Sequence, residues 1–209
     1  MSSLFPMFLK LEGKRCLVVG AGTVGAPKIV RLAETGARVS VIALEAREEI
    51  NELAGEKKIV LELRAFEAND LDGKFLAVVA TASPALNQAI YEEAQRRGVL
   101  CNVVDVPELC DFYYPAVVQR GDLQIAISTN GQSPSLAQKL RQQLEKQFGP
   151  GYAPWVAELG ATRKLVLASS FSPERKRKLL HSLASREAFE TSLAATKEIN
   201  ENEDRRVTA

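Results

Sequence analysis

Three glycines at fixed spacing are the residues of this sequence whose types most directly indicate chemistry. Gly20, Gly22 and Gly25 form the pattern GxGxxG. Between a strand and a helix, the first glycine makes a tight turn and the third lets the helix pack closely on the strand. The second lets backbone N–H groups approach a pyrophosphate. A glycine-rich turn without a ligand is the alternative, but the flanking residues favour a dinucleotide-binding site.

The residues on either side of the glycines have the patterns of strands and a helix. Residues 15–20 form an apolar run, typical of a strand buried on both faces. Residues 23–35 have helical spacing, with Pro27 in the first turn and Gly36 just after the end. Residues 37–43 alternate and are β-branched, which predicts a second strand. Together these segments predict a βαβ unit.

Strands and helices continue to alternate through residue 104. We expect a helix at 45–54, strands at 59–64 and 75–81, a helix at 84–97 and a strand at 99–104. This alternation predicts an α/β fold with a Rossmann-like, mostly parallel sheet covered by helices on both faces. In such sheets, ligands bind outside the carboxyl ends of the strands.

A carboxylate follows the last of these strands. Asp105 comes directly after an apolar run, at the carboxyl end that faces the same crevice as the glycines. An Asp at such a place is either a turn former or a general base, which takes a proton from a substrate that gives up a hydride. Its expected position beside the nicotinamide favours the general base.

Two further segments are expected to border the nucleotide. Thr81 and the small residues after it leave room at the end of a strand, although they suit equally well a helix N-cap before Pro84. Glu45 is the carboxylate nearest to the end of the second strand, and it either reaches a ribose hydroxyl or simply opens a helix. No Arg stands immediately there to hold a 2′-phosphate, although Arg47 is close, so the sequence favours NAD over NADP.

The pattern changes near residue 112 to that of a hairpin. Apolar strands are expected at 114–119 and 123–128, joined by the short turn at 120–122. They should pair antiparallel, with Tyr113 and Tyr114 in the hairpin core. Because these strands fall outside the parallel sheet, they need a partner surface, which predicts a homodimer.

Helices are expected in the remainder of the chain. Ser133 and Pro134 suit the N-cap and first position of a helix, and the glycine-rich stretch 149–151 ends it. A new helix should begin at residues 172–174, and the polar residues 198–209 should fray. We therefore expect a Rossmann domain at 1–113, a dimerisation region at 114–150 and a helical C-terminal domain at 151–209.

Composition and charge exclude several function classes. The formal net charge is +1, which gives no reason to expect a nucleic-acid partner. The three cysteines lack paired spacing and there is no CxxC or HxxxH pattern, so no metal cage is expected. His181, among leucines, is expected to be packed or on the surface. With no signal peptide or membrane-spanning apolar run, we expect no membrane partner and a reducing cytoplasm.

Positive charge gathers in the C-terminal half of the chain. The balance of charged residues is −3 for residues 1–113 and +4 for residues 114–209, with a basic cluster within residues 160–186. Such a cluster suits a solvated helix face or an anionic partner.

From residue 102 onward the sequence closely resembles a known family. The matching residues are 102–107, Phe112, Pro115, Ala116, Arg120, Gly121, 123, 125–129, Gly131, Ser133 and Pro134. They resemble the precorrin-2 dehydrogenase of the siroheme synthase family, and the resemblance extends over roughly residues 5–150. It implies a Rossmann domain, a small dimerisation region and a helical C-terminal region.

The resemblance also implies an activity and a set of site residues. That family oxidises precorrin-2 to sirohydrochlorin with NAD as the hydride acceptor. Some members also insert ferrous iron to give sirohaem, so iron is a possible substrate here and not a bound cofactor. The family's key Asp matches Asp105. Its nucleotide contacts match Thr23, Val24, Leu44 and Glu45, and its tetrapyrrole pocket matches Ser128 and Thr129.

Precorrin-2 carries several carboxylates, so cationic side chains should surround the crevice. Arg120, Arg141 and the basic residues at 163–178 are the candidates. The chain departs from many relatives at Pro27, where they have an Arg before the lysine that matches Lys28.

Two other function classes stay open. A nucleotide-sensing module without catalysis would explain the glycines but not residues 102–145. A dehydrogenase of another class would normally show Tyr-x-x-x-Lys, which this sequence lacks.

Overall fold

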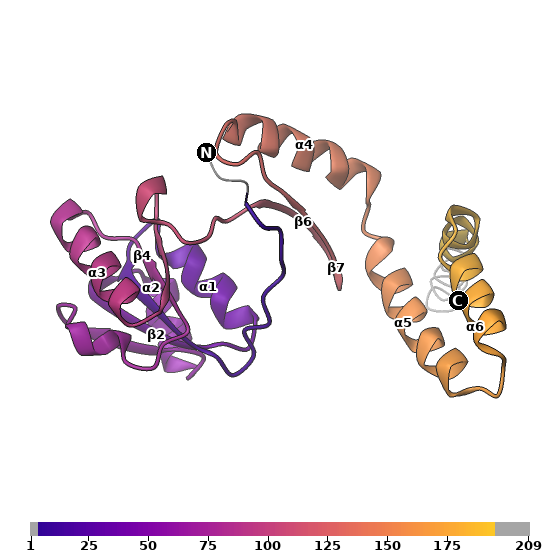
Figure 1. The fold of residues 1–209 in the computed structure, drawn as a ribbon, viewed down its shortest axis with the longest axis horizontal. Coiled ribbons are helices and arrows are strands. Elements are labelled where there is room, and N and C mark those ends of the chain that lie inside the picture. The colour runs from indigo at the N-terminus through magenta and orange to yellow at the C-terminus, as the bar shows by residue number, and fades with distance from the viewer. Residues whose placement is uncertain (1–3, 195–209) are drawn as a thin grey trace, which may run out of the picture. The chain divides into compact units, whose positions relative to one another are not determined.

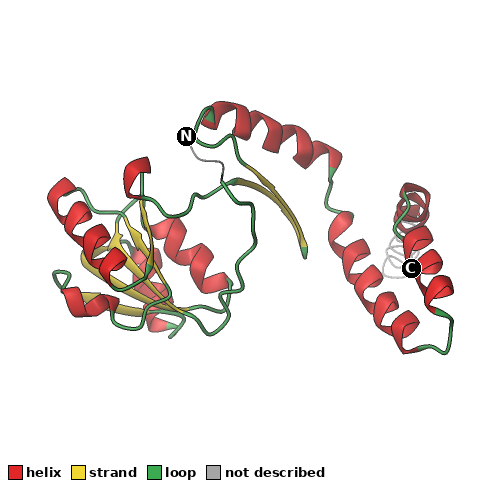
Figure 2. Ribbon diagram, in the orientation of Figure 1, coloured by secondary structure: helices red, strands yellow, loops and turns green. Residues whose placement is uncertain are grey.

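Alternating strands and helices fold the residues up to Tyr114 into a parallel sheet flanked by helices. The computed structural model describes residues 4–194. The sheet has the order β3-β2-β1-β4-β5, and every neighbouring pair is parallel (Figures 1 and 2). Its strands are β1 (Arg15–Ala21), β2 (Arg38–Ala46), β3 (Val60–Leu63), β4 (Leu76–Val79) and β5 (Leu100–Val103). The predicted Rossmann-like sheet is confirmed.

Helices cover both faces of this sheet. Side chains alternate between the two faces along each strand, and apolar side chains on both faces need cover from water. The helices are α1 (Ala26–Glu34), α2 (Glu48–Gly55) and α3 (Pro84–Arg96), with short 3-10 turns η1 (Ala68–Leu71) and η2 (Pro107–Leu109). On one face, Cys16 and Val18 pack with Ile29 of α1 and Ile50 of α2. On the other face, Leu17 and Val19 pack with Ile90 of α3. Each face thus has its own apolar core.

Several predicted element ends are wrong, and the differences lie beside the glycines. The helix expected from residue 23 begins at Ala26, because residues 23–25 form a turn in which the Ala26 N–H donates to the Gly22 carbonyl at 2.9 Å. The second strand continues to Ala46 and not to residue 43. The next helix starts at Glu48, and β4 ends at Val79, before Thr81.

The second unit, from Pro115 onward, contains a hairpin and helices. Strands β6 (Ala116–Arg120) and β7 (Leu123–Ile127) pair antiparallel, as predicted, and α4 (Pro134–Gln147) packs on both of them. Two further helices, α5 (Tyr152–Ala168) and α6 (Pro173–Leu183), follow. Ser133 and Ser172 cap α4 and α6, as their positions before proline predict.

Aromatic side chains hold part of the second unit together. Tyr152 packs against Phe148, Trp155 and Phe189, with ring centroids 5.1, 5.7 and 4.1 Å apart. Tyr113 and Tyr114 do not belong to the hairpin core, since β6 begins only at Ala116 and Tyr114 belongs to the first unit. That prediction was wrong.

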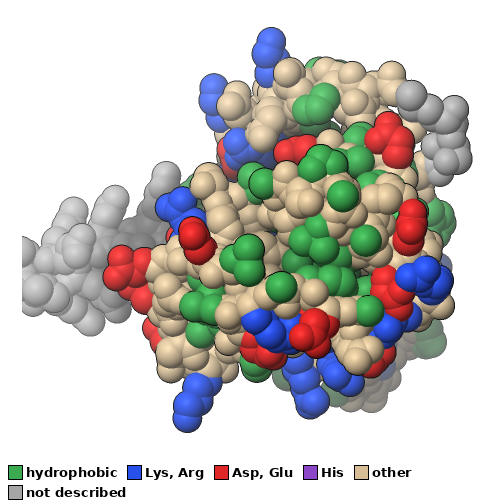
Figure 3. All heavy atoms as spheres, turned by 90° about the vertical axis from the view of Figure 1, so that its left-hand side faces the viewer, with side chains coloured by type: hydrophobic (Ala, Val, Ile, Leu, Met, Phe, Trp, Pro, Cys, Tyr) green, Lys and Arg blue, Asp and Glu red, His purple; other side chains and the backbone are tan. Residues whose placement is uncertain are grey.

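The chain divides into two units, Met1–Tyr114 and Pro115–Ala209. The further division of the second unit at residue 150 stays a prediction, and the fraying expected at 198–209 lies outside the described residues. Over residues 4–194, no helix has the length and apolarity that crossing a membrane requires. The face of the molecule in Figure 3 intersperses Lys and Arg with Asp and Glu, in keeping with the small net charge.

Candidate nucleotide and substrate site

The predicted site residues of the first unit gather at one edge of the sheet. Strands β1, β4 and β5 are adjacent and parallel, so their carboxyl ends lie side by side. The glycine loop begins at Gly20, near the carboxyl end of β1, Thr81 follows β4 by two residues, and Asp105 follows β5 by two residues. The direction of strand order reverses between β1 and β4, which is where open α/β sheets bind their ligands.

The three glycines differ in what surrounds them. Gly20 has φ +98°, and a Cβ there would lie 2.3 Å from the carbonyl oxygen of Ala80. A Cβ on Gly25 would lie 2.1 Å from the carbonyl oxygen of Gly20. A Cβ on Gly22 would meet nothing within 4 Å. The fold itself therefore requires glycine at positions 20 and 25, whereas Gly22 borders open space.

The N-terminus of α1 opens into this space and suits an anion. In the described part of the chain no side chain caps Gly25, and the first turn of α1 contains no acidic residue. Thr23 and Val24 are exposed, the latter by 47%. Uncapped N–H groups and the helix dipole both favour a phosphate here. The residues present therefore fit the pyrophosphate of a dinucleotide.

A bulge in β2 brings two more predicted residues to the same edge. Val19 of β1 pairs with Ile42, but Ala21 pairs with Ala46, so β2 bulges between these pairs. Leu44 and Glu45 lie in the bulge and are exposed, Leu44 by 77%. Bulges next to ligand sites re-aim side chains in this way.

Arg47 lies closer to the glycine loop than the sequence indicates. Its Nη1 donates to the Thr23 Oγ1 at 3.4 Å, and its Nε lies 3.3 Å from a Glu49 carboxylate oxygen. The backbone N–H of Arg47 also donates to the Ala21 carbonyl. The Arg47 guanidinium therefore lies beside the glycine loop, two residues after Glu45. The preference for NAD over NADP stays a prediction.

Thr81 is held by a buried amide. Its hydroxyl donates to the Asn87 Oδ1 at 2.6 Å, and the Asn87 Nδ2 donates to the Thr81 carbonyl at 3.2 Å. Ser83 is the N-cap of α3, and its hydroxyl accepts from the Leu86 N–H. The helix-cap alternative thus applies to Ser83, whereas Thr81 is half-buried just after β4.

Asp105 sits in an uncommon backbone conformation. Its φ is +63°, in the left-handed region, and the residue is exposed. Asp tolerates this region better than most side chains, yet such residues are rare enough to mark sites where position matters. Within residues 4–194 no cation lies at ion-pair distance from this carboxylate, so it is available to a ligand.

The loop that carries Asp105 is tied back to β5. The Nδ2 of Asn102, a residue only 5% exposed, donates to the Phe112 carbonyl at 2.7 Å. The Cys110 thiol lies 3.1 and 3.2 Å from the carbonyl oxygens of Val103 and Val106 and can donate its one hydrogen to either of them. Burial raises the pKa of this thiol, which keeps it protonated. The Asp111 carboxylate accepts from the Cys101 N–H at 2.8 Å. These bonds fix both ends of the loop.

Replacing Asn102 by Ala should loosen this loop. The Phe112 carbonyl would lose its donor inside the protein, which costs about 1–3 kcal/mol. We expect the free energy of unfolding in urea to fall by that amount. Gln95→Ala is the matched control, because Gln95 is exposed and donates to Asp111 of the same loop. Equal losses for the two variants would contradict a special role for the buried amide.

Lys28, which matches a lysine of the relatives, is a residue of α1 to which the sequence alone assigns no role in the site. Its Nζ lies 4.3 Å from the centroid of the Tyr114 ring. Burial and the charge of Arg31 lower the pKa of Lys28, whereas the charge of Asp105 raises it. Val104, the residue before Asp105, packs against the same core cluster as Ile29 of α1. The signal in the sequence was a lysine in the first turn of a helix, where the dipole disfavours a cation.

The two arginines predicted to bind substrate carboxylates have partners within the second unit. The Arg120 guanidinium donates to the carbonyls of Phe148 (2.8 Å), Gln119 (2.8 Å) and Glu145 (3.2 Å). Arg141 forms an ion pair with Glu145, four residues along α4. Arg120 therefore anchors the end of α4 to the hairpin, which favours a structural role over substrate binding.

Ser128 and Thr129 lie in the turn between β7 and α4. The Ser128 hydroxyl accepts from the Asn130 N–H, and the Thr129 hydroxyl accepts from the Ser133 N–H, both at 3.1 Å. Ser128 is exposed and Thr129 half-buried. Their role in a tetrapyrrole pocket stays a prediction.

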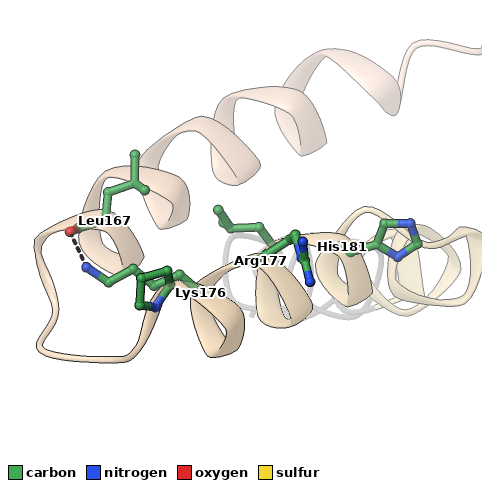
Figure 4. Close-up of a pocket in the computed structure, with 6 residues that line it drawn as sticks. Leu167, Lys176, Arg177 and His181 are labelled. Carbon is green, nitrogen blue, oxygen red and sulfur yellow. Dashed lines mark hydrogen bonds between the residues drawn. The ribbon is translucent and has the colours of Figure 1, made fainter.

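Three side chains in the basic cluster of the C-terminal helices make local contacts. Lys176 donates to the Leu167 carbonyl at 2.8 Å and so caps α5 (Figure 4). Arg175 lies over the Phe171 ring, and Lys178 pairs with Glu174. A shallow hollow of about 560 Å³ lies beside them, lined by Leu167, Pro173, Lys176, Arg177, Leu180 and His181.

His181, on α6, lines that hollow and is exposed, as expected for a surface histidine. No group of His, Cys, Asp or Glu among residues 4–194 has the arrangement of a metal site.

Two family models match the chain in sequence. The model described as putative NAD(P)-binding matches residues 7–116, and the model described as sirohaem biosynthesis protein central matches residues 120–147. The two matches follow one another along the chain, as the resemblance in the sequence leads one to expect.

Curated relatives and one solved structure agree with these models. A siroheme synthase of Methylococcus capsulatus is 45% identical over 140 residues, which is 67% of this chain and 30% of that protein. A siroheme synthase of Nitrosococcus oceani is 40% identical over 147 residues, or 70% of this chain and 31% of that protein. The chain thus spans under a third of the length of these relatives.

The solved structure of SirC, a precorrin-2 dehydrogenase, matches over 97% of this chain and 100% of that chain. Its TM-score is 0.79 and its sequence identity 27%. The resemblance to the siroheme synthase family is confirmed. The chain therefore belongs to the putative NAD(P)-binding family, among the proteins in which this domain is followed by a sirohaem biosynthesis central segment.

Proposed function

We propose that this protein oxidises precorrin-2 to sirohydrochlorin, with NAD as the hydride acceptor, in sirohaem biosynthesis. One observation carries the proposal: a nucleotide-binding glycine loop and the available carboxylate of Asp105 share one edge of the sheet. The match to SirC over nearly the whole chain supports the same substrate.

Some of the site residues would bind the cofactor and others the substrate. Gly22, Thr23 and Val24 would hold the pyrophosphate through the backbone at the start of α1. Leu44 and Glu45 in the β2 bulge would border the ribose, and Thr81 the space after β4. When bound, NAD supplies the hydride acceptor.

Asp105 is the residue assigned to proton transfer. Oxidation removes a hydride and a proton from the macrocycle, and a carboxylate oxygen of Asp105 would accept the proton. The tied loop from Asn102 to Asp111 holds this carboxylate in place, so that the reacting groups meet without further rearrangement. Ser128 and Thr129 would contact the tetrapyrrole.

The test is conversion of precorrin-2 followed by absorbance. With NAD present, we expect sirohydrochlorin and NADH to form in equal amounts. The same assay with NADP in place of NAD tests the cofactor preference. Nucleotide binding without any conversion would overturn the proposal and favour a sensing module.

The same assay tests chelation, because the macrocycle itself supplies the metal ligands. Ferrous iron is added as a substrate once sirohydrochlorin has formed. If sirohydrochlorin takes up ferrous iron no faster than in a protein-free control, the protein catalyses the dehydrogenation and not the chelation.

We also propose a homodimer formed through the hairpin and α4. In the described residues β6 and β7 pair only with each other, and two-stranded sheets are marginal alone. Leu136 lies on α4, the helix that packs on these two strands, and this apolar side chain is 48% exposed. Open strand edges and exposed apolar side chains suit a second copy of the chain.

Leu136→Glu should weaken this dimer. A carboxylate in an apolar interface must lose its hydration, so we expect dissociation at least tenfold more favourable by sedimentation velocity. Gln142→Glu, at an exposed position on another side of α4, is the control. A monomeric wild-type protein at micromolar concentration would refute the dimer.

A further inference from the structure

Lys28 is a cation that the fold places at an unfavourable position. It lies in the first turn of α1, which begins at Ala26, and it is half-buried. The positive end of the helix dipole and partial burial both disfavour an ammonium group there. Residues placed against local rules in this way commonly serve a ligand.

The ammonium group of Lys28 is held in place by aromatic rings. Its Nζ lies 4.3 Å from the Tyr114 ring centroid, and Tyr114 packs edge-on against Phe112 at 5.8 Å. Phe112 in turn packs against the core cluster of the α1 face. A cation over an aromatic face keeps its charge and its donors. The group is therefore fixed and able to bind.

Nothing within residues 4–194 neutralises this charge by direct pairing, since no carboxylate lies within 4 Å of the Lys28 Nζ. Arg31 adds positive charge nearby, and Asp105 is the acidic group whose charge reaches Lys28. Val104, the residue before Asp105, packs against the core cluster that includes Ile29 of α1, so the segments of Lys28 and Asp105 meet on the same face of the sheet. An anionic ligand bound there would pair with the Lys28 ammonium group.

Several of the other candidate cations already have partners. Arg120 donates to three backbone carbonyls, Arg141 pairs with Glu145, and Lys176 caps α5. A substrate with several carboxylates needs at least one cation near the reacting carboxylate of Asp105. Among the cations discussed, Lys28 is the one near Asp105 without an ionic partner.

We propose that Lys28 is a substrate-binding residue whose ammonium group holds a carboxylate of the tetrapyrrole beside Asp105. This inference rests on the proposed function, and it assigns substrate binding to a cation without an ionic partner, whereas Arg120 and Arg141 have partners within the second unit. Because the contact forms in the bound substrate and in the reacting one alike, it should act on KM more than on kcat.

Lys28→Gln tests the inference, with Lys28→Arg as the conservative variant. We expect the KM for precorrin-2 to rise about tenfold or more in Lys28→Gln, as for the loss of one charge-assisted hydrogen bond. Arg should restore most of the affinity. The Kd for NAD should stay within about twofold of wild type.

Lys14→Gln is the matched control. The Lys14 Nζ also lies over an aromatic ring, 5.4 Å from the Phe75 centroid, but Lys14 precedes β1, at the opposite end of the strands. It should leave KM unchanged. An equal KM for Lys28→Gln and Lys14→Gln would overturn the inference. So would a weaker Kd for NAD with an unchanged KM, which would assign Lys28 to the nucleotide phosphates.

A binding assay separates this inference from the proposed function. Uroporphyrin, a tetrapyrrole with eight carboxylates, serves as a fluorescent probe that needs no turnover. If uroporphyrin binds the wild-type protein and binds Lys28→Gln about tenfold more weakly, the inference is supported even if precorrin-2 is not oxidised. Turnover of precorrin-2 without any effect of Lys28→Gln on KM or on porphyrin binding overturns the inference alone.

Discussion

Asp105→Asn is expected to lower kcat for precorrin-2 oxidation by about 10²–10⁴-fold, the usual contribution of a positioned acid or base. Asn has the same shape but cannot accept the proton. It also tolerates the φ of +63° at this position, so the loop should keep its conformation. The rate is followed as NADH absorbance under saturating precorrin-2 and NAD.

The control for this prediction is Glu108→Gln. Glu108 is an exposed carboxylate in η2 of the same loop, so the variant removes the same charge three residues away. We expect its kcat to equal that of wild type, and the Kd for NAD to be unchanged in both variants. Full activity in Asp105→Asn would remove the carboxylate from the mechanism.

Gly22→Ala is expected to raise the Kd for NAD about 100-fold without loss of stability. The added Cβ meets no protein atom within 4 Å, and Gly22 does not have a positive φ. The methyl group would instead occupy the space that a pyrophosphate needs for close approach to the backbone. Titration of NAD by calorimetry and thermal unfolding measure the two effects separately.

Two other glycine variants serve as controls for this prediction. Gly55→Ala, at the end of α2, also adds a Cβ into open space but lies outside the glycine loop, so NAD binding should match wild type. Its stability should equal or slightly exceed that of wild type, because Ala favours a helix more than Gly does. Gly25→Ala forces a Cβ to 2.1 Å from the Gly20 carbonyl oxygen, and we expect it to destabilise the fold by about 3 kcal/mol or more. Unaltered NAD binding in Gly22→Ala would exclude the loop as the pyrophosphate site.

The sequence predicts the sheet well, because its signals are local. Strand β1, the glycines and α3 follow from apolar runs and from residues such as Gly98, which ends α3 with a positive φ. The bulge that exposes Leu44 and Glu45 does not follow from any local pattern. It arises from the pairing of β2 with β1.

The candidate site is predicted less completely, because partners distant in the sequence decide it. Arg120 is expected to bind substrate, yet its Nε donates to Phe148, 28 residues away. Lys28 acquires its role from Tyr114, also distant in the sequence. The sequence identifies the cationic side chains. Only the folded structure shows which of them already have a hydrogen-bond or ionic partner within the protein.

The glycine loop and Asp105 would respond very differently to mutation over evolutionary time. The nucleotide part of the site depends on the absence of a Cβ at positions 20, 22 and 25, whereas the exposed side chain of Val24 is less constrained. The oxidation step depends on one carboxylate. A single codon change at Asp105 would therefore leave a folded protein that still binds its dinucleotide. Such a protein is a starting point from which a nucleotide sensor can evolve without a change of fold.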